Sequence, residues 1–403
     1  MNATTKRLLL GLGAATGAAL LAKTLSWRIK RLLHAIHLFD EDKIVGNFLG
    51  MDQFFDTRTV HAPHTPFHFE YGLAFTLPEQ FEMNGQMLNS AEWMQRTGTN
   101  GLLILKNDQV IYEEYFQGHC PTNRHISWSV AKSFVSALFG IAIERGYIRS
   151  IEETVTNYLP EMAGTGYDSV RIKDVLQMSS GVRFNEDYGD FNSDINRFGR
   201  IMAFGGSFSK FAQSLENERP PGTYLHYVSI DTQVLAMILM RSTGKNMTEL
   251  LEQWLWQPLG MEHDAFWLTD SQGVEMALGG LNATLRDYAK FGRLYLHNGN
   301  WNGTQLVPAD WVQASITPDA PHLMPGENDL SETTRGYGLQ WWIPNNPDGE
   351  FMAIGIYNQF IYISPKDNLV IVKQSANPTF TQDDGRSSDE SVAFFRAIAK
   401  SLV

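Results

Sequence analysis

Strand-like segments near both ends of the chain constrain the fold most strongly. Residues 101–118 have the pattern of two strands joined at Asn107 and Asp108, and residues 351–375 that of two more, joined across residues 365–368. Runs of branched and aromatic residues separated by turn-forming residues are typical of paired strands. We therefore expect one sheet that is completed by N-terminal and C-terminal strands.

Helical periodicity marks the segments that remain. They are residues 129–145, 172–178, 230–242, 285–297 and the C-terminal 389–402. The predicted fold class is α/β of the α+β type, an antiparallel sheet of N- and C-terminal strands flanked by helices, with a mostly helical insert subdomain. The 403 residues would suffice for two average domains, but a single domain can reach this size.

Charge is distributed unevenly along the chain. Residues 1–39 contain no acidic residue, and their basic residues are Lys6, Arg7, Lys23, Arg28, Lys30 and Arg31. The remainder holds 26 of the 32 Lys and Arg residues against all 44 Asp and Glu residues. An acidic body repels a polyanion, so we expect no nucleic-acid partner. The domain prediction is a hydrophobic and basic leader or membrane anchor over 1–38 and one globular domain over 39–403.

The leader has the composition of a targeting or membrane segment. Residues 8–22 are apolar but fall short of the roughly 20 residues that span a bilayer comfortably. They fit the core of a signal peptide or an uncleaved anchor, although no clear cleavage site follows. Residues 25–39 mix apolar and basic side chains as an interfacial helix does. We predict an exported, periplasmic or membrane-anchored protein; a solvated leader is the alternative.

Disulfide and metal chemistry find little support in the sequence. Cys120 is the single cysteine, so an internal disulfide and a cysteine-based zinc site are both excluded. Asp190, Asp194 and His322 do not have the spacing of metal ligands. We expect neither a metal nor a cofactor.

The pattern Ser-x-x-Lys, which can pair a nucleophile with a base, occurs three times. The matches are Ser129/Lys132, Ser207/Lys210 and Ser242/Lys245. Ser207 has the context of a helix cap, and Gly244 is a helix-stop signal that favours a solvated turn for Lys245. Only the first pair stands inside an apolar run.

Lys132 is therefore the unusual residue. Lysine is almost never buried without a partner or a purpose, and burial lowers its pKa toward a neutral amine that can take a proton. Ser129 lies three residues earlier, on the same face of a helix and at its positive N-terminal end. The pair predicts a serine nucleophile activated by a lysine base. The alternative is a lysine that extends along the helix edge to solvent.

These residues resemble the serine β-lactamase/penicillin-binding-protein superfamily, which carries Ser-x-x-Lys as its first motif. The likeness continues through residues 155–162, 172–184, 220–239, 279–299 and 355–365. It is greatest to the class C-like branch that contains family VIII carboxylesterases, DD-peptidase relatives and 6-aminohexanoate-dimer hydrolases. The resemblance implies a β-lactamase-like fold and an acyl-enzyme intermediate on Ser129.

The resemblance places the second motif at Tyr227 and Ser229. A tyrosine beside a buried ammonium has its phenolate favoured, so we expect Tyr227 to help Lys132 deprotonate Ser129 and to pass the proton to the leaving group. A core tyrosine is the alternative. Ser229 stands where an asparagine is commoner, and we predict that it contacts substrate.

The third motif departs from the superfamily. Lys-Thr-Gly is replaced by Ala353, Ile354 and Gly355, so a cation that holds a substrate carboxylate is lost. Such a charge-assisted contact is worth about 1.5–3 kcal/mol, which makes efficient β-lactam turnover unfavourable. Gly355 still permits close backbone approach and is a predicted substrate-binding residue. The N–H groups of Ile356 and Ser129 are the predicted oxyanion hole.

Two further residues are predicted to contact substrate. Tyr188 lies in the polar segment 185–199, which has the composition of a mobile loop, and Trp342 ends the run GYGLQWW just before the third motif. A solvated loop and core packing are the respective alternatives. The predicted substrate is a small ester or amide, including ω-amino-acid oligomers. The rival interpretations are a DD-peptidase or weak β-lactamase, and a non-catalytic binding or scaffold homologue.

Overall fold

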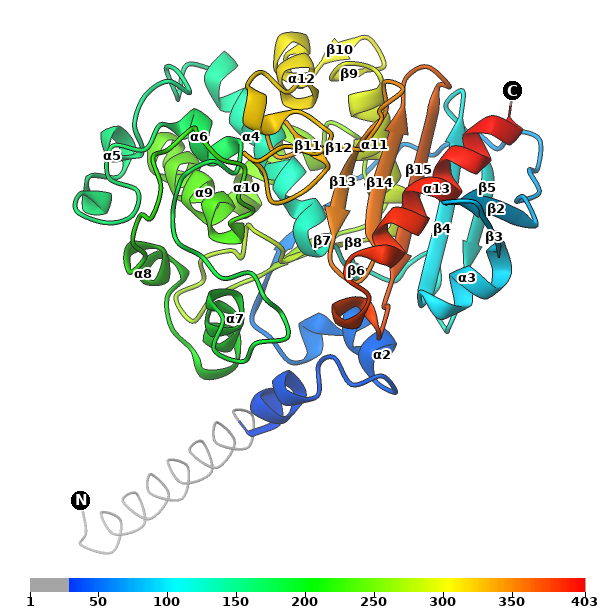
Figure 1. Ribbon diagram of the computed structural model, residues 1–403, viewed down its shortest axis with the longest axis horizontal. Helices are drawn as coiled ribbons and strands as arrows, with labels where there is room; N and C mark the ends of the chain where they lie inside the picture. Colours follow the sequence, from blue (N-terminus) through cyan, green and yellow to red (C-terminus); the bar gives the residue numbers. More distant parts are fainter. Residues whose placement is uncertain (1–28, 403) are drawn as a thin grey trace, which may run out of the picture.

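The computed structural model describes residues 29–402 and is built around one seven-stranded antiparallel sheet (Figure 1). The strand order is β11-β12-β13-β14-β15-β4-β5. The strands are β4 Thr99–Lys106, β5 Gln109–Tyr115, β11 Gly336–Tyr337, β12 Trp342–Ile343, β13 Phe351–Gly355, β14 Gln359–Ser364 and β15 Leu369–Ser375. Ile371 of β15 pairs with Ile104 of β4. The two ends of the chain therefore complete one sheet, as predicted.

The predicted strands are correct where the turn between them consists of residues that favour turns. Asn107 and Asp108 join β4 to β5 with φ values of 50° and 66°, and both residue types tolerate this left-handed region. The segment 351–375 forms three strands rather than two, so that prediction was wrong. The additional turn is made by Tyr357 and Asn358 at φ 61° and 68°, and Gly355 and Asn358 are the only turn-forming residue types there.

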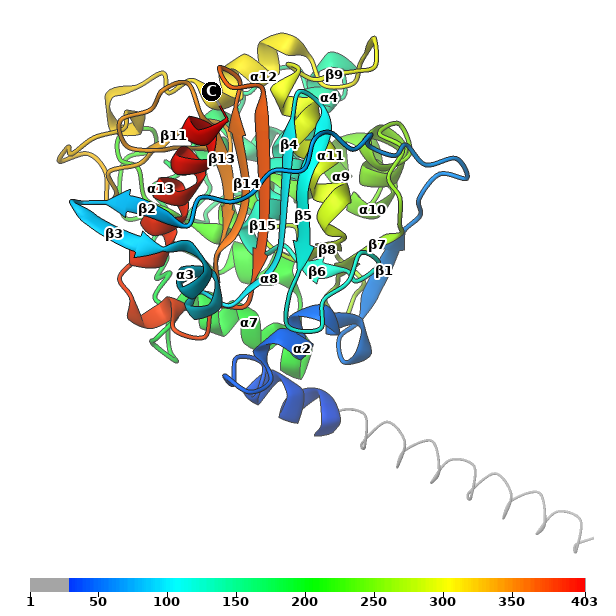
Figure 2. The same cartoon turned by 90° about the vertical axis from the view of Figure 1, so that its right-hand side faces the viewer.

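Helices cover both faces of the sheet. The helix α11, Leu285–Leu296, lies on one face with α4, Ala131–Glu144, and α13, Arg386–Ser401, lies on the other (Figure 2). Alternate residues of β15 serve the two layers, since Val370 belongs to the α11 core and Ile371 to the α13 core. Gly292 lets α11 approach closely, because a Cβ there would stand 2.6 Å from the Cγ1 atom of Val370.

A helical region fills the middle of the chain and packs on α4 (Figure 1). Its helices are α5 Val155–Tyr158, α6 Ile172–Leu176, α7 Asp194–Phe204, α8 Phe208–Gln213, α9 Ser229–Thr243 and α10 Met247–Leu251. Ser207 caps α8 by accepting from the backbone N–H of Lys210, and Gly244 ends α9 at φ 69°. Two of the three Ser-x-x-Lys matches therefore serve helix ends, as expected.

A second, four-stranded sheet was not predicted. Its strand order is β1-β7-β8-β6, and it contains β1 Thr57–Val60, β7 Ala265–Leu268, β8 Leu281–Ala283 and β6 His125–Ile126. The short strand β6 pairs with β8 and ends immediately before the segment that carries Ser129. This sheet therefore fixes the position of the chain just before Ser129.

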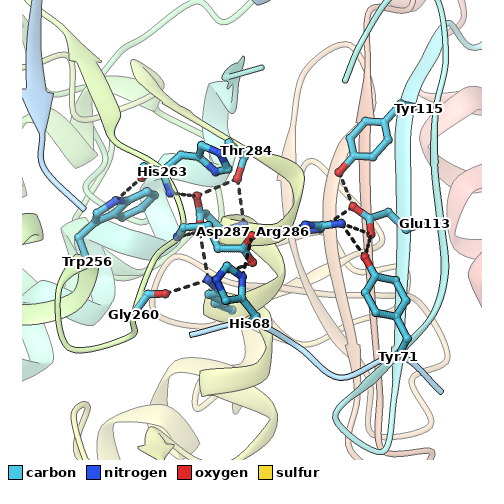
Figure 3. A network of polar contacts seen from close by, with 12 residues as sticks. His68, Tyr71, Glu113, Tyr115, Trp256, Gly260, His263, Thr284, Arg286 and Asp287 are labelled. Carbon is cyan, nitrogen blue, oxygen red and sulfur yellow. Dashed lines mark hydrogen bonds and ion pairs between the residues drawn. The ribbon is translucent and has the colours of Figure 1, made fainter. Parts of the chain in front are cut away.

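A polar network fastens His68 and Tyr71, in the segment that follows β1, to the body (Figure 3). Arg286 of α11 donates to Glu113 of β5 at 2.7 and 3.0 Å and to the Tyr71 hydroxyl at 2.6 Å. Asp287 accepts from the backbone N–H groups of Glu262 and His263. The network ties α11, the edge strand β5 and the N-terminal segment together.

The remaining strands and named α-helices flank the layers described above. They are α2 Ile44–Leu49, the hairpin of β2 Gln80–Met83 and β3 Gln86–Asn89, α3 Ser90–Arg96, the hairpin of β9 Asn300–Trp301 and β10 Thr304–Gln305, and α12 Ala309–Ile316. Residues 1–28, which include the predicted membrane segment 8–22, lie outside the described residues.

Candidate active site

Ser129 begins the central helix of the protein. It lies in the 3₁₀ turn Trp128–Val130 that leads directly into α4, and it is partly exposed while its neighbours are buried. Trp128 has φ 46°, a conformation that costs on the order of 1–3 kcal/mol in a residue other than glycine. The bond from Ser127 N–H to the carbonyl of Leu281 in β8, 2.8 Å long, holds this turn in place. The hydroxyl of Ser129 is thereby presented at a helix N-terminus.

Lys132 is buried beneath Ser129. Its side chain is 1 % exposed, and its Nζ atom lies 2.9 Å from Ser129 Oγ, 3.3 Å from Ser229 Oγ and 2.7 Å from the Leu278 carbonyl oxygen. The expected approach of the two side chains is therefore present, and Lys132 does not extend to solvent.

Burial lowers the pKa of Lys132 to about 7, while Glu186 and Asp231 act in the opposite direction. The atoms that bond Nζ are two hydroxyls and a carbonyl, which stabilise an ammonium less than a carboxylate in contact would. A substantial fraction of neutral amine is consequently present near neutral pH.

The ring of Tyr227 lies next to the Lys132 amine. The Lys132 Nζ atom lies 5.2 Å from the centre of the Tyr227 ring, and that ring stacks on Trp342 at 5.3 Å between centroids. The backbone N–H of Tyr227 donates to Glu332 at 2.7 Å. The structure thus brings Ser129, Lys132, Tyr227 and Trp342 together, and the indole of Trp342 orients the phenol.

The expectation of a favoured phenolate was wrong. Burial raises the pKa of the Tyr227 phenol, Glu186 raises it further, and hydrogen bonding with Ser129 and Ser229 only opposes this rise. A lysine that is itself close to neutral supplies no lasting cation to hold a phenolate. Tyr227 is therefore a neutral phenol at the pH where Lys132 becomes a base.

The third-motif strand approaches the nucleophile through its glycine. A Cβ on Gly355, at the end of β13, would stand 2.4 Å from the Ser127 carbonyl oxygen, so a larger residue does not fit. Ile356 follows, and Gln359 donates to the carbonyl oxygens of Ile356 and Tyr357 at 3.3 and 3.1 Å. Gln359 therefore holds the turn that carries the predicted oxyanion N–H beside the Ser129 turn. The assignment of the Ile356 N–H to the oxyanion hole remains a prediction.

Comparison with known proteins identifies the family to which this chain belongs. The family model described as Beta-lactamase matches residues 91–391. The chain belongs to the β-lactamase family. This family membership confirms the resemblance of the sequence motifs and makes the protein a β-lactamase-related serine hydrolase.

Particular relatives refine the comparison. The chain is 33 % identical over 293 residues to the 6-aminohexanoate-dimer hydrolase of Paenarthrobacter ureafaciens, covering 71 % of this chain and 74 % of that protein. A solved Bacillus anthracis candidate 6-aminohexanoate-dimer hydrolase superposes with a TM-score of 0.81 at 26 % identity, covering 91 % of this chain and 96 % of that one. The hydrolase EstCE1, whose acyltransferase activity is promiscuous, shares the fold with a TM-score of 0.61 at 14 % identity, covering 77 % and 95 %.

In this β-lactamase family member, Ser229 connects the lysine to an acidic residue. Ser229 is buried, and its hydroxyl accepts from Lys132 and donates to Glu186 Oε1 at 2.5 Å. The Ser229 hydroxyl thus both accepts and donates a hydrogen bond inside the protein. A contact between Ser229 and substrate remains a prediction, and the structure gives Ser229 an internal partner on each side.

Glu186 is a site residue that sequence reasoning missed. It accepts from the Ser229 N–H at 3.2 Å and from the Tyr188 hydroxyl at 2.6 Å. Burial raises the pKa of this carboxyl, while Lys132 and the hydroxyl donors oppose the rise. The segment 185–199 is the predicted substrate loop and Tyr188 its predicted contact, but nothing in the sequence distinguishes Glu186 from the other acidic residues of that segment.

Asp231 is a second residue that the sequence did not reveal. It is fully buried in α9, accepts from the Tyr167 hydroxyl at 2.8 Å, and its pKa is raised to about 8 by burial. Asp231 acts on Lys132 through space rather than by contact. Its position, two residues after Ser229 in the first turn of α9, was the available signal.

Proposed function

We propose that this protein hydrolyses small esters or amides, including linear ω-amino-acid oligomers, through an acyl-enzyme on Ser129. The observation that carries the proposal is the buried Lys132 amine, with Nζ 2.9 Å from Ser129 Oγ and a pKa lowered to about 7 by burial. A weak alcohol nucleophile needs an adjacent base of this kind.

The hydrogen bonds around Lys132 support its role as base. The Leu278 carbonyl can only accept, and the Ser229 hydroxyl already donates to Glu186, so both must accept from Nζ. A neutral amine has two N–H groups, and these two partners use them. Its lone pair is then left for the Ser129 hydroxyl. The neutral lysine therefore receives the proton of Ser129 as the oxygen attacks the carbonyl carbon.

The remaining steps follow from the neighbouring groups. The N–H groups of Ser129 and Ile356 stabilise the oxyanion of the tetrahedral intermediate. Tyr227, a neutral phenol, gives its proton to the departing alkoxide or amine and regains one through Lys132. Water then attacks the acyl-enzyme with the same groups, which releases the acid and restores Ser129.

The missing third-motif cation supports an ester or small amide over a β-lactam. Ala353 of β13 is buried and carries no charge where the superfamily places a lysine that binds a carboxylate. The 33 % identical relative is named a 6-aminohexanoate-dimer hydrolase. We propose the same substrate class for this chain, because its third motif provides no fixed cation for a substrate carboxylate.

A substrate panel tests this proposal. Turnover of p-nitrophenyl butyrate and of the linear 6-aminohexanoate dimer is measured beside acylation by a fluorescent penicillin. We expect ester or amide turnover, with penicillin acting only as a slow acylating agent. Fast penicillin turnover without esterase or amidase activity would contradict the proposal and favour a β-lactamase. Inertness toward the whole panel, with no covalent labelling, would favour a non-catalytic scaffold.

Replacing Glu186 with glutamine is expected to move the acid limb of the pH profile to lower pH. The carboxylate raises the pKa of Lys132, so its loss lowers that pKa further, and the neutral base then persists in more acidic solution. The measurement is kcat/KM against pH for p-nitrophenyl butyrate. Tyr188→Phe is the matched control, because it removes one hydrogen bond to Glu186 but leaves the charge. If the acid limb of the Glu186→Gln variant stayed at the wild-type pH, Glu186 would not influence the pKa of the base.

A further inference from the structure

The helix over residues 29–36 is turned so that its polar side faces the protein. Arg31 is 5 % exposed, its Nη1 atom is 2.7 Å from Asp56 Oδ2, and its Nε donates to the Met202 carbonyl oxygen at 2.5 Å. His34 stacks on Phe54 at 3.6 Å between ring centroids. A helix on the surface of a soluble domain normally buries its apolar stripe. Here a buried arginine and a histidine contribute to the attachment, beside Ala35, which packs on the core.

The outward side of the same helix is apolar. Ile29, Leu33 and Ile36 are 49 %, 51 % and 62 % exposed, and their spacing places them on one face. Phe39 is exposed just beyond the helix, and Phe204 is exposed at the end of α7, two residues from the carbonyl that Arg31 binds. Both views place this helix, α2 and α7 at one end of the molecule (Figures 1 and 2). We call Ile29, Leu33, Ile36, Phe39 and Phe204 the apolar rim.

The chain that precedes the rim indicates what covers it. Residues 8–22 are apolar, Lys23, Trp27 and Arg28 follow before the exposed face begins at Ile29, and Lys30 lies within the helix; residues 1–39 contain no acidic residue. Apolar side chains beside cations and a tryptophan suit the interface of an anionic bilayer. Among residues 29–402, no helix combines the length and the apolarity that crossing a bilayer requires.

We propose that the apolar rim docks on the surface of a bilayer that contains anionic phospholipid. The helix over residues 29–36 lies in the plane of the headgroups and inserts Ile29, Leu33 and Ile36, while Arg31 and His34 remain attached to the domain. The docking is independent of the hydrolytic reaction, because none of these side chains contacts Ser129 or Lys132.

The consequence concerns the candidate active site. Phe39 stacks on Tyr357 at 5.1 Å and lies 5.9 Å from Trp128 between ring centroids. Tyr357 follows Ile356 and Trp128 precedes Ser129, so the rim adjoins the two residues whose N–H groups form the predicted oxyanion hole. Docking therefore brings the bilayer surface beside the site where an acyl group would bind.

A fluorescent probe on the helix tests the docking. In the full chain carrying Cys120→Ser, Ile36→Cys is labelled with the environment-sensitive dye NBD and mixed with phosphatidylcholine/phosphatidylglycerol vesicles. We expect a several-fold rise in emission, a shift to shorter wavelength, and quenching by spin labels on the lipid acyl chains. The matched control is Leu73→Cys, since Leu73 is 92 % exposed on the segment that pairs with β5, away from this end (Figure 2).

Three outcomes would overturn the proposal. Vesicle flotation without any change at position 36 would mean that residues 1–28 bind lipid while the rim stays in water. No flotation would exclude a lipid partner. A change at position 36 that grows with protein concentration in the absence of vesicles, together with a dimer in sedimentation, would assign the rim to a second copy. Each readout is independent of turnover, so loss of the proposed hydrolytic function would not affect it.

Discussion

Replacing Ser129 with alanine is expected to lower kcat/KM for p-nitrophenyl butyrate by about 10³-fold or more. The variant keeps the helix start and the buried Lys132 but has no oxygen to carry the acyl group. Covalent labelling by a fluorophosphonate should disappear in parallel. Because Ser129 is partly exposed and lies in the turn before α4 rather than in the packed core, we expect the fold to be retained.

Ser242→Ala is the matched control for this variant. Ser242 begins another Ser-x-x-Lys match, but its hydroxyl only donates to the Leu239 carbonyl at the end of α9. Its loss should leave both labelling and turnover unchanged. Persistent labelling of the Ser129→Ala variant would place the nucleophile elsewhere. Absence of labelling in the wild-type chain would favour the scaffold alternative.

Features encoded by local periodicity were predicted from the sequence. The pairing of β4 and β5 about Asn107 and Asp108, and the helices α4, α9 and α11, depend on patterns within a few residues. The sheet β1-β7-β8-β6 was missed, because its strands have only two to four residues and pair across long separations. The turn at Tyr357 was missed for a different reason, since tyrosine at φ 61° carries no turn signal.

The difference between local and long-range contacts also explains which residues of the candidate site could be predicted. Ser129 and Lys132 meet because three residues separate them on one helix, which the sequence states directly. Glu186 reaches Ser229 only through the course of an irregular loop, so neither its contact nor its effect on Tyr227 could be foreseen. The expectation for the Tyr227 pKa was wrong mainly because burial raises this pKa, and the missed Glu186 raises it further.

Replacing Lys132 with methionine is expected to lower kcat/KM by about 10²- to 10⁴-fold and to remove the acid limb, which the wild-type protein should show near pH 7. The thioether fills a similar volume but cannot accept the Ser129 proton. Lys210→Met, at an exposed lysine of another Ser-x-x-Lys match, is the control and should not change the profile. A Lys132→Met variant with the wild-type limb would assign the limb to another group.

Stability provides a second readout of the same substitution, and its sign follows from the pKa. Folding lowers the pKa of Lys132 from 10.5 to about 7, so between these values the unfolded chain binds the additional proton and the stability of the wild-type protein rises with pH. Lys132→Met removes this contribution. The free energy of unfolding, measured by urea denaturation at about pH 7 and about pH 9, should therefore increase less in the variant than in the wild type. An equal increase in both proteins would show that the Lys132 amine keeps its proton in the folded state, and the neutral base required for attack by Ser129 would be absent.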